Sequence, residues 1–329
     1  MLKSHTRTFH YRILQLHSKM VKVAIAGGTG VMGKTLVDVL TGQSIHKGIV
    51  LTRKDINTKT SIPHVVVDYN DVEDLVKVLE EHEIHTIISA FGINGTSLSI
   101  SQANLIKAAE SSSVTKRFIP SSFAIKYPVS GTQILPPLQS YFDSLDLLKT
   151  TSLEWAVVHN GTFLDYFFPP SIKSHYSHGT LVIDIPHTKA GILGTGNELI
   201  TLTYTLDVAR FVIAALDLPE WPRELRIVGE TLTFNKLITL AENATGKKFD
   251  VKYDSLETLK KSQITELPGH ENDYKKYPKE VLLPFLSIFQ RWMAEGLAFI
   301  PIEGSLNEKF PDIKPLTAQE LMEKHWKSL

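Results

Sequence analysis

The chain has no cysteine among its 329 residues. This absence excludes disulfide bonds, thiolate nucleophiles and cysteine-ligated zinc, and it suits a reducing compartment. An excess of charge is missing as well, because 35 basic residues balance 35 acidic ones. A chain without net charge gives no indication of a basic surface that would bind a nucleic-acid backbone. We therefore expect a cytoplasmic protein that does not bind nucleic acid.

Long apolar runs are also absent. A membrane span needs about 20 consecutive apolar residues, and the nearest segment, 281–300, is interrupted by Pro284, Arg291 and Glu295. We interpret it as an amphipathic helix over the core and expect no membrane partner. The 13 histidines form no HExxH motif and no carboxylate–histidine cluster, so no metal ion is expected.

The N-terminal segment has no acidic residue, and the first one in the chain is Asp38. A basic, acid-poor leader is typical of mitochondrial targeting segments. The alternative is a plain upstream extension, since Met20 directly precedes the first apolar run. Both interpretations exclude residues 1–19 from the fold and leave open whether they are removed.

Apolar and periodic segments alternate from Val21 to about Thr162. Short, nearly continuous apolar runs, typical of strands buried on both faces, occupy 21–26, 47–53, 64–69, 85–91, 116–122 and 154–160. Segments with helical periodicity lie between them, at 71–82, 99–113 and 137–151. The alternation predicts an α/β fold, a Rossmann-type doubly wound parallel sheet with helices on both faces.

The second half loses this rhythm after a cluster of prolines and glycines. An amphipathic helix follows with Asp207 as its expected N-cap, then a strand over 223–229 and a helix from about Thr233. Thr317 and Glu320 near the C-terminus have the spacing of a capping box.

Two regions are therefore expected. A nucleotide-binding domain spans 20–162, and residues from about 195–230 return to it. A smaller, discontinuous α/β region over 163–329 binds the substrate.

The stretch VKVAIAGGTGVMGKTLVDVL, residues 21–40, has the most informative motif. Gly27 permits a tight turn after the strand, Gly30 lets the backbone approach a pyrophosphate, and Gly33 lets the helix pack against the sheet. Free N–H groups and the positive end of the helix dipole favour a diphosphate there. We expect a dinucleotide to bind at Gly27, Thr29, Gly30, Val31, Met32 and Gly33. A tight turn without a ligand is the alternative.

Arg53 ends the second predicted strand, 20 residues after Gly33. An acidic residue at this place would read the 2′-hydroxyl of NAD, whereas an arginine suits the 2′-phosphate of NADP. Lys54 and Lys59 add positive charge, and Asp55 opposes it. We expect NADP(H) rather than NAD(H); a solvated arginine at a strand end is the alternative.

These motifs occur together with RFIPSSF (117–123) and LRIVGETLTFNKLITLAENATGKKF (225–249). The combination resembles the NmrA-like, isoflavone-reductase-like family of atypical short-chain dehydrogenases, especially its fungal members. The resemblance runs from about Met20 to the C-terminal region. It implies an oxidoreductase with a small, aromatic or secondary-metabolite substrate.

The resemblance also implies site residues at matching positions. Those beside the adenine are Asp68 and Tyr69, and those beside the nicotinamide ribose are Ser89, Ala90 and Phe91. Those in the substrate pocket are Asn160, Gly161 and Phe163, together with Ser122, which replaces a glutamate usual in the family. Phe167 belongs to a set of aromatic residues expected around the crevice, which suits an apolar aromatic substrate.

The family's reductases carry a lysine in the helix before the sixth strand, and Tyr141 occupies its place. Tyr141 can donate a hydrogen bond to a carbonyl, but no lysine follows four residues later to lower its pKa. Lys126, after the fifth strand, and His159, at the end of the sixth, are further acid–base candidates. Each residue also has a purely structural interpretation. Tyr141 would be an aromatic side chain in the pocket wall, Lys126 a solvated loop lysine, and His159 a hydrogen-bonded structural histidine.

An NADPH-dependent reductase that acts by hydride transfer is therefore the favoured function. The missing lysine leaves two others open. One is a non-catalytic NADP(H)-binding regulator that senses redox state, and the other is an isomerase or cyclase on the same fold. Substrate identity, reaction direction, stereochemistry and oligomeric state stay open.

Overall fold

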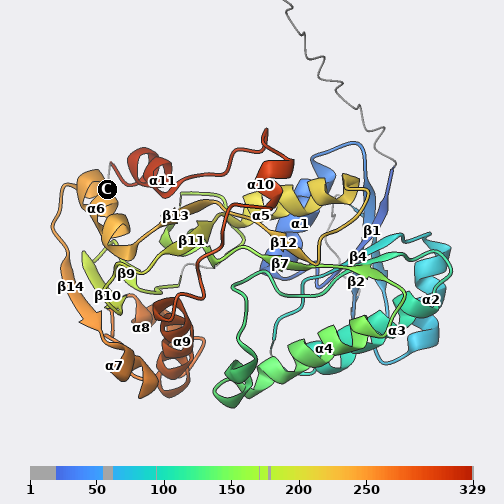
Figure 1. Ribbon diagram of the computed structural model, residues 1–329, viewed down its shortest axis with the longest axis horizontal. Coiled ribbons are helices and arrows are strands. Elements are labelled where there is room, and N and C mark those ends of the chain that lie inside the picture. The colour runs from blue at the N-terminus through green and yellow to red at the C-terminus, as the bar shows by residue number, and fades with distance from the viewer. Residues whose placement is uncertain (1–19, 55–61, 94, 170, 177–178, 328–329) are drawn as a thin grey trace, which may run out of the picture.

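The computed structural model describes residues 20–54, 62–93, 95–169, 171–176 and 179–327 (Figure 1). The expected leader, 1–19, lies outside these residues, as do Asp55 and Lys59.

A six-stranded parallel sheet forms the centre of the N-terminal half. Its strands, in spatial order, are β3 (His64–Val66), β2 (Lys47–Thr52), β1 (Lys22–Ala26), β4 (Thr86–Ser89), β5 (Arg117–Ile119) and β6 (Glu154–Trp155). After Ala156 the chain continues as β7 (Val157–His159), which pairs in parallel with β12 (Glu224–Arg226). Because the chain runs outward from β1 to β3 and then returns to β4, the strand order reverses between β1 and β4. Ligands of such sheets bind at this reversal, outside the carboxyl ends of the strands.

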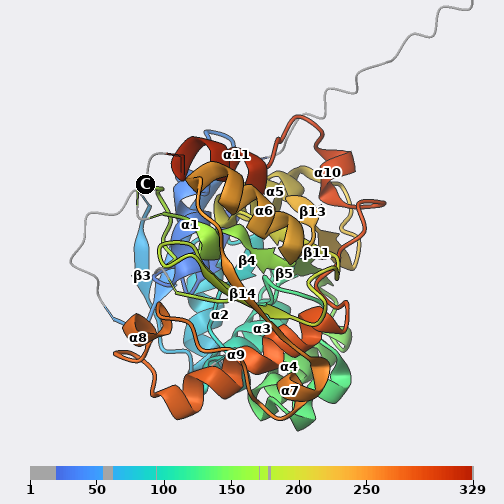
Figure 2. The same ribbon diagram turned by 90° about the vertical axis from the view of Figure 1, so that its left-hand side faces the viewer.

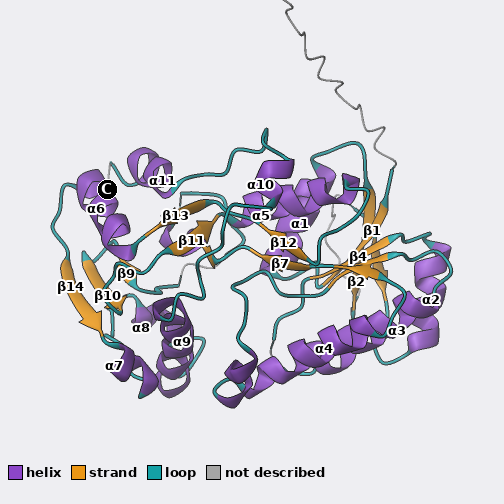
Figure 3. Ribbon diagram, viewed as in Figure 1, coloured by secondary structure: helices purple, strands orange, loops and turns teal. Residues whose placement is uncertain are grey.

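Helices cover both faces of the sheet (Figures 1 and 3). One face holds α1 (Val31–Thr41) and α5 (Thr205–Ala214), and the other holds α2 (Val72–Glu81), α3 (Ala103–Ser111) and α4 (Gln139–Lys149). Each face has its own buried core, with Leu36 and Val212 in the first and Leu75 and Leu105 in the second. Burial on both faces explains why the strands are apolar almost throughout. The predicted α/β fold of Rossmann type is confirmed.

The smaller second domain, which we expect to bind the substrate, faces the viewer in Figure 2. Its two three-stranded sheets consist of β9 (Ile183–Asp184), β10 (Lys189–Leu193) and β14 (Asp250–Asp254), and of β8 (Thr162–Phe163), β11 (Ile200–Thr203) and β13 (Glu230–Leu232). Its helices are α6 (Phe234–Thr245), α7 (Leu256–Lys260), α8 (His270–Asp273), α9 (Lys279–Ala294) and α11 (Ala318–His325). The short helix α10 (Leu306–Lys309) instead lies beside α5, and its Leu306 joins the core under α1 and α5 (Figure 1).

Short 3₁₀ and π segments connect these elements. They are η1 (Ser97–Gln102), η2 (Val129–Gln133), η3 (Pro136–Leu138), η4 (Leu164–Phe167) and η5 (Ala215–Asp217). The π segment η1 forms the start of the helix predicted over 99–113.

Most of the predicted helix ends are found. The Thr317–Glu320 capping box is present, and the side chain of Thr233 caps α6. The expected N-cap role of Asp207 is wrong, because α5 begins at Thr205, two residues before it. The N–H of Thr205 instead donates to the distant carboxylate of Asp165 at 2.9 Å, a tertiary contact that local sequence does not reveal.

The amphipathic helix expected over 281–300 is observed as α9, with Pro284 in its second turn. Within the residues described, no helix combines the length and the apolar character needed to cross a bilayer.

Candidate functional site

The loop between β1 and α1 can exist only with glycine at particular positions. Gly27 has φ +79°, and a Cβ there would lie 2.6 Å from the Ala90 carbonyl oxygen. A Cβ on Gly33 would lie 2.2 Å from the Gly27 carbonyl oxygen, so α1 rests directly on the loop. Gly28, which the sequence did not single out, is equally confined, because its Cβ would lie 2.5 Å from Val50.

At Gly30, unlike Gly27 and Gly33, neither backbone conformation nor packing excludes a side chain. It is the N-cap of α1, has φ −78°, and would place a Cβ no closer than 3.3 Å to its nearest neighbour. Packing therefore does not require glycine there. No side chain among the described residues caps α1, so its first N–H groups stay available to an anion.

A hollow of about 370 Å³ lies at the carboxyl ends of β2 and β3 and is separate from the central cavity described below. Its lining consists of Arg53, Val66, Val67, Asp68, Tyr69, Asn70, Thr96, Ile100 and Ser101. Arg53 and the neighbouring Lys54 are exposed. Tyr69 is buried and donates to the Leu51 carbonyl at 3.2 Å; burial raises the pKa of its phenol. Tyr69 thus forms the floor of the hollow.

Asp68 holds the turn after β3. Its carboxylate accepts hydrogen bonds from the backbone N–H and the side-chain amide of Asn70, both at 2.9 Å, and these bonds lower the pKa of Asp68. The carboxylate therefore stays ionised at the rim of the hollow.

The end of β4 connects the glycine loop to the central cavity. The Ser89 hydroxyl is buried and has no hydrogen-bond partner among the described residues. Ala90 and Phe91 line the cavity, and the Phe91 carbonyl accepts a hydrogen bond from Ser121 Oγ at 2.6 Å. This segment therefore borders both the predicted nucleotide site and the cavity.

The central cavity has a volume of about 340 Å³ and draws its walls from both halves of the chain. Nine of its lining residues are aromatic: Phe91, Phe123, Tyr127, Tyr141, Phe163, Tyr166, Tyr176, Phe285 and Phe289. Among the described residues that line it, none is a lysine, arginine, histidine, aspartate or glutamate. Such a concave, mostly apolar surface with a few polar groups is typical of a small-molecule site.

Tyr141, on α4, is one of the predicted residues that the structure brings to this cavity. Its side chain is buried and packs edge-to-face on Tyr127, with ring centroids 5.4 Å apart. Burial, and then the nearby Glu224 carboxylate, raise the pKa of Tyr141 to about 12. Tyr141 therefore keeps its proton throughout the neutral range.

Lys126 and His159 are placed elsewhere. Lys126 is exposed, and its ammonium pairs with Glu224 at 2.6 Å. His159 is buried, and burial lowers its pKa to about 4 despite the nearby Glu224 carboxylate. Neither side chain lines the cavity. Both nevertheless lie near Glu224, whose carboxylate also raises the pKa of Tyr141.

Of the predicted substrate-binding residues, some line the cavity and others do not. Phe163 and Ser122 line the cavity, although the Ser122 hydroxyl already bridges to β7, donating to the Val158 carbonyl at 2.9 Å. Asn160 and Phe167 are buried but are not part of the lining. The ring of Phe167 instead packs on Phe234 in the adjoining core.

Sequence reasoning missed several of the aromatic walls. Phe285 and Phe289 are four residues apart on α9, and their shared helix face was a usable signal. Tyr127 and Tyr176 lie in irregular segments without any periodic pattern. Only the folded chain brings these four side chains to the cavity.

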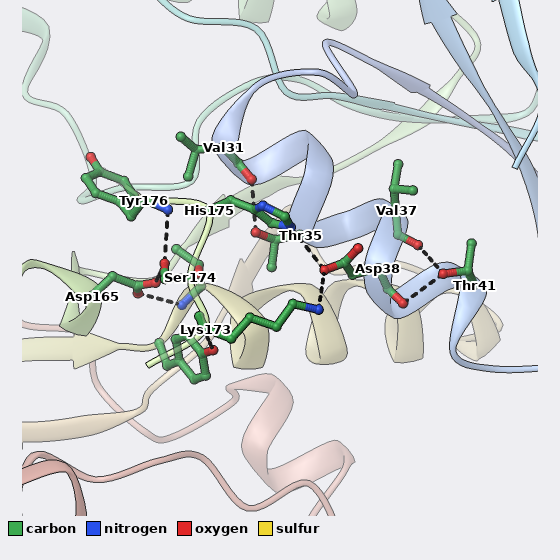
Figure 4. A network of polar contacts seen from close by, with 12 residues as sticks. Val31, Thr35, Val37, Asp38, Thr41, Asp165, Lys173, Ser174, His175 and Tyr176 are labelled. Atoms are coloured by element: carbon green, nitrogen blue, oxygen red, sulfur yellow. Dashed lines mark hydrogen bonds and ion pairs between the residues drawn. The ribbon is translucent and has the colours of Figure 1, made fainter. Parts of the chain in front are cut away.

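The segment that carries Tyr176 is attached to α1 (Figure 4). Lys173 Nζ and His175 Nε2 each lie 3.0 Å from the same carboxylate oxygen of Asp38. Partial burial raises the pKa of Asp38, but the hydrogen bonds from these two side chains outweigh it, so the net shift is downward. Ser174 Oγ donates to the buried Asp165 at 2.5 Å. Segment 171–176 thus connects the two halves of the chain beside the glycine loop.

Known proteins are similar to this chain in sequence and in fold. The chain is 37% identical to "Oxidoreductase BOA1" of Botryotinia fuckeliana over 300 residues, which covers 90% of this chain and 96% of that protein. It is 30% identical to "Oxidoreductase swnN" of Metarhizium robertsii, with 93% and 98% covered. Leucoanthocyanidin reductase from Vitis vinifera, solved as a complex with NADPH, has a similar fold, with a TM-score of 0.71 at 18% identity and 92% and 98% coverage.

Fold, site and relatives together define the class of this protein as an oxidoreductase of Rossmann type. The NmrA-like family model matches residues 19–320. The chain therefore belongs to the NmrA-like family.

Proposed function

We propose that this protein is an NADPH-dependent reductase of a small, neutral, aromatic or secondary-metabolite molecule. One observation carries the proposal: Met32 of the glycine loop and Ala90 at the end of β4 line the same cavity as Phe285 and Phe289 of the substrate domain. A dinucleotide held at the loop would therefore present its reactive ring to a ligand in the aromatic cavity. The enzyme class of the relatives supports this function.

The residues present fit the cofactor. Gly30 at the uncapped start of α1 leaves room and N–H donors for the diphosphate. The exposed guanidinium of Arg53, at the rim of the hollow at the ends of β2 and β3, suits a 2′-phosphate. When bound, NADPH would supply a hydride from its nicotinamide. A cytoplasmic location is part of the same proposal.

The cavity walls would select and orient the substrate. Aromatic faces stack on an aromatic ring and exclude water from it, which strengthens each remaining polar contact. An ionised substrate group would find no opposite charge among the described lining residues and would lose its hydration. The substrate is therefore neutral where it contacts the cavity.

The absence of a lysine or histidine from the described lining favours a second candidate. The chain could bind NADP(H) as a redox-sensing regulator, or act as an isomerase or cyclase, without reducing a substrate. These functions share the cofactor site with the reductase and differ from it only in the step after the cofactor has bound.

Calorimetric titration with NADPH, NADP+ and NADH tests the proposal. The variant is Arg53→Ala, and the matched control is Lys47→Ala, which removes an exposed cation from the opposite end of β2. We expect Arg53→Ala to weaken NADPH binding about 10- to 100-fold, the effect of one lost charge-assisted contact, and to leave NADH binding unchanged.

The control should bind NADPH as the wild type does. Failure of the wild type to bind any of the three nucleotides would refute the proposed function. If Arg53→Ala lost affinity for NADPH and NADH equally, the role of Arg53 in recognising the 2′-phosphate would be refuted.

A further inference from the structure

Hydride transfer to a substrate requires a proton donor, and the described cavity lining offers only hydroxyl groups for this role. Three of them are already engaged. Ser121 Oγ donates to the Phe91 carbonyl, Ser122 Oγ to the Val158 carbonyl, and Thr162 Oγ1 to the sulfur of Met293. The phenols of four tyrosines remain: Tyr127, Tyr141, Tyr166 and Tyr176.

Two of these phenols form a pair. The hydroxyl oxygens of Tyr166 and Tyr176 lie 2.6 Å apart, which is hydrogen-bond distance. Burial raises the pKa of both, and their mutual hydrogen bond raises that of Tyr166 further while it lowers that of Tyr176. Either hydroxyl can be the donor within the pair. Where Tyr166 donates, Tyr176 is the acceptor. The proton of Tyr176 is then free for a ligand.

The position of Tyr176 is defined from both halves of the chain (Figure 4). Its backbone N–H donates to Ser174 Oγ at 3.0 Å, and Ser174 in turn donates to the buried Asp165. Lys173 and His175, on either side of Ser174, contact Asp38 on α1. The hydroxyl of Tyr176 is therefore held relative to the helix whose N-terminus would bind the cofactor.

We propose that Tyr176 donates the proton that completes substrate reduction, supported by a hydrogen bond from Tyr166, and that it takes the place of the missing lysine. This inference rests on the proposed reductase function. Its substrate class is a neutral aromatic molecule with a carbonyl group next to the ring.

The atoms balance for such a carbonyl. Tyr176 Oη gives its proton to the carbonyl oxygen as that oxygen gains the π-electron pair and the carbonyl carbon receives the hydride lost by NADPH. Tyr166 then returns a proton to Tyr176 Oη, and solvent reprotonates Tyr166. Carbonyl compound, NADPH and one proton become alcohol and NADP+.

The test uses acetophenone as the probe with the full-length protein. Tyr176→Phe and Tyr166→Phe each remove one hydroxyl. Tyr274→Phe is the matched control, because its phenol is bonded to Glu266, away from the cavity. Three readouts are NADPH affinity by calorimetry, the infrared carbonyl stretch of acetophenone bound with NADP+, and the rate of NADPH oxidation by acetophenone.

We expect all three variants to bind NADPH as the wild type does. The bound carbonyl stretch should lie below its value in water-free solvent in the wild type and the control, and should lose this shift in Tyr176→Phe. NADPH oxidation should fall at least about 100-fold in Tyr176→Phe, as for loss of a positioned acid, and less in Tyr166→Phe.

A polarised carbonyl or full activity in Tyr176→Phe would overturn the inference. So would failure of the wild type to bind or reduce acetophenone while it binds NADPH normally. Failure to bind NADPH would instead refute the proposed function itself, so the two outcomes are distinguishable.

Discussion

Gly30 and Gly33 lie three residues apart at the start of α1, yet alanine should affect stability and cofactor binding differently at the two positions. A Cβ on Gly33 would lie 2.2 Å from the Gly27 carbonyl oxygen and 2.6 Å from Gly28 Cα, and real Cβ atoms stay beyond 3.0 Å. Because both neighbours are backbone atoms, α1 must move by about 0.8 Å. Overpacking of this kind costs about 1–3 kcal/mol, and we expect Gly33→Ala to lie near the upper value.

Gly30→Ala meets no such barrier. The nearest atom to the new Cβ is 3.3 Å away, and φ −78° suits alanine. Its free energy of unfolding should stay within about 0.5 kcal/mol of the wild type, as for a surface change. The new methyl group would nevertheless occupy the place where the diphosphate approaches, so NADPH binding should weaken at least about tenfold.

Urea unfolding followed by circular dichroism measures the free energy of unfolding of both variants. Calorimetric titration with NADPH measures the loss of affinity in Gly30→Ala. The reasoning fails if Gly33→Ala is as stable as the wild type, or if Gly30→Ala loses as much stability as Gly33→Ala. Wild-type NADPH affinity in Gly30→Ala would show that the diphosphate does not approach this glycine.

Three further predictions concern stability and local order. The pKa of His159 is about 4 in the fold and about 6.5 in an unfolded chain, so unfolding takes up a proton between these values. The unfolding free energy should therefore fall by about 3 kcal/mol as the pH drops from 6.5 to 4, and His159→Gln should abolish this part of the slope in urea titrations. Asp38→Asn should change stability by less than about 1 kcal/mol but speed hydrogen–deuterium exchange in 171–176, whereas unchanged exchange would show that Asp38 does not hold the segment. Thr317→Ala should cost about 1 kcal/mol through loss of the capping box, measured by thermal unfolding against Thr231→Ala, an exposed threonine in β13.

The fold could be predicted because its signals are local. Strands buried on both faces must be apolar throughout, and the glycine spacing reports a backbone geometry that few other residues permit. The N-cap of α5 could not be predicted, because the group that accepts the Thr205 N–H belongs to Asp165, 40 residues earlier.

The candidate site was predictable in part. Ala90, Phe91 and Phe163, which the family resemblance implies, line the cavity, and so does Tyr141 of α4. Position after a strand alone misplaced Lys126, because its ammonium pairs with Glu224 and its side chain is not part of the cavity lining.

Tyr176 shows the limit most clearly. Its segment has no periodicity, and its place in the cavity depends on contacts with Asp38 and Asp165, 138 and 11 residues earlier in the sequence. The contact with Asp38 joins segments far apart in the sequence, so local sequence does not reveal it.

The uncharged cavity has an evolutionary consequence. Its glycine loop belongs to the sheet, whereas Phe285 and Phe289 belong to α9, a helix outside that sheet. Replacing one of these rings by a smaller or bulkier residue would reshape the pocket and leave the glycine loop intact. Divergence can therefore proceed one wall residue at a time, so that descendants of a single ancestor acquire new substrates while they conserve the apparatus for electron donation.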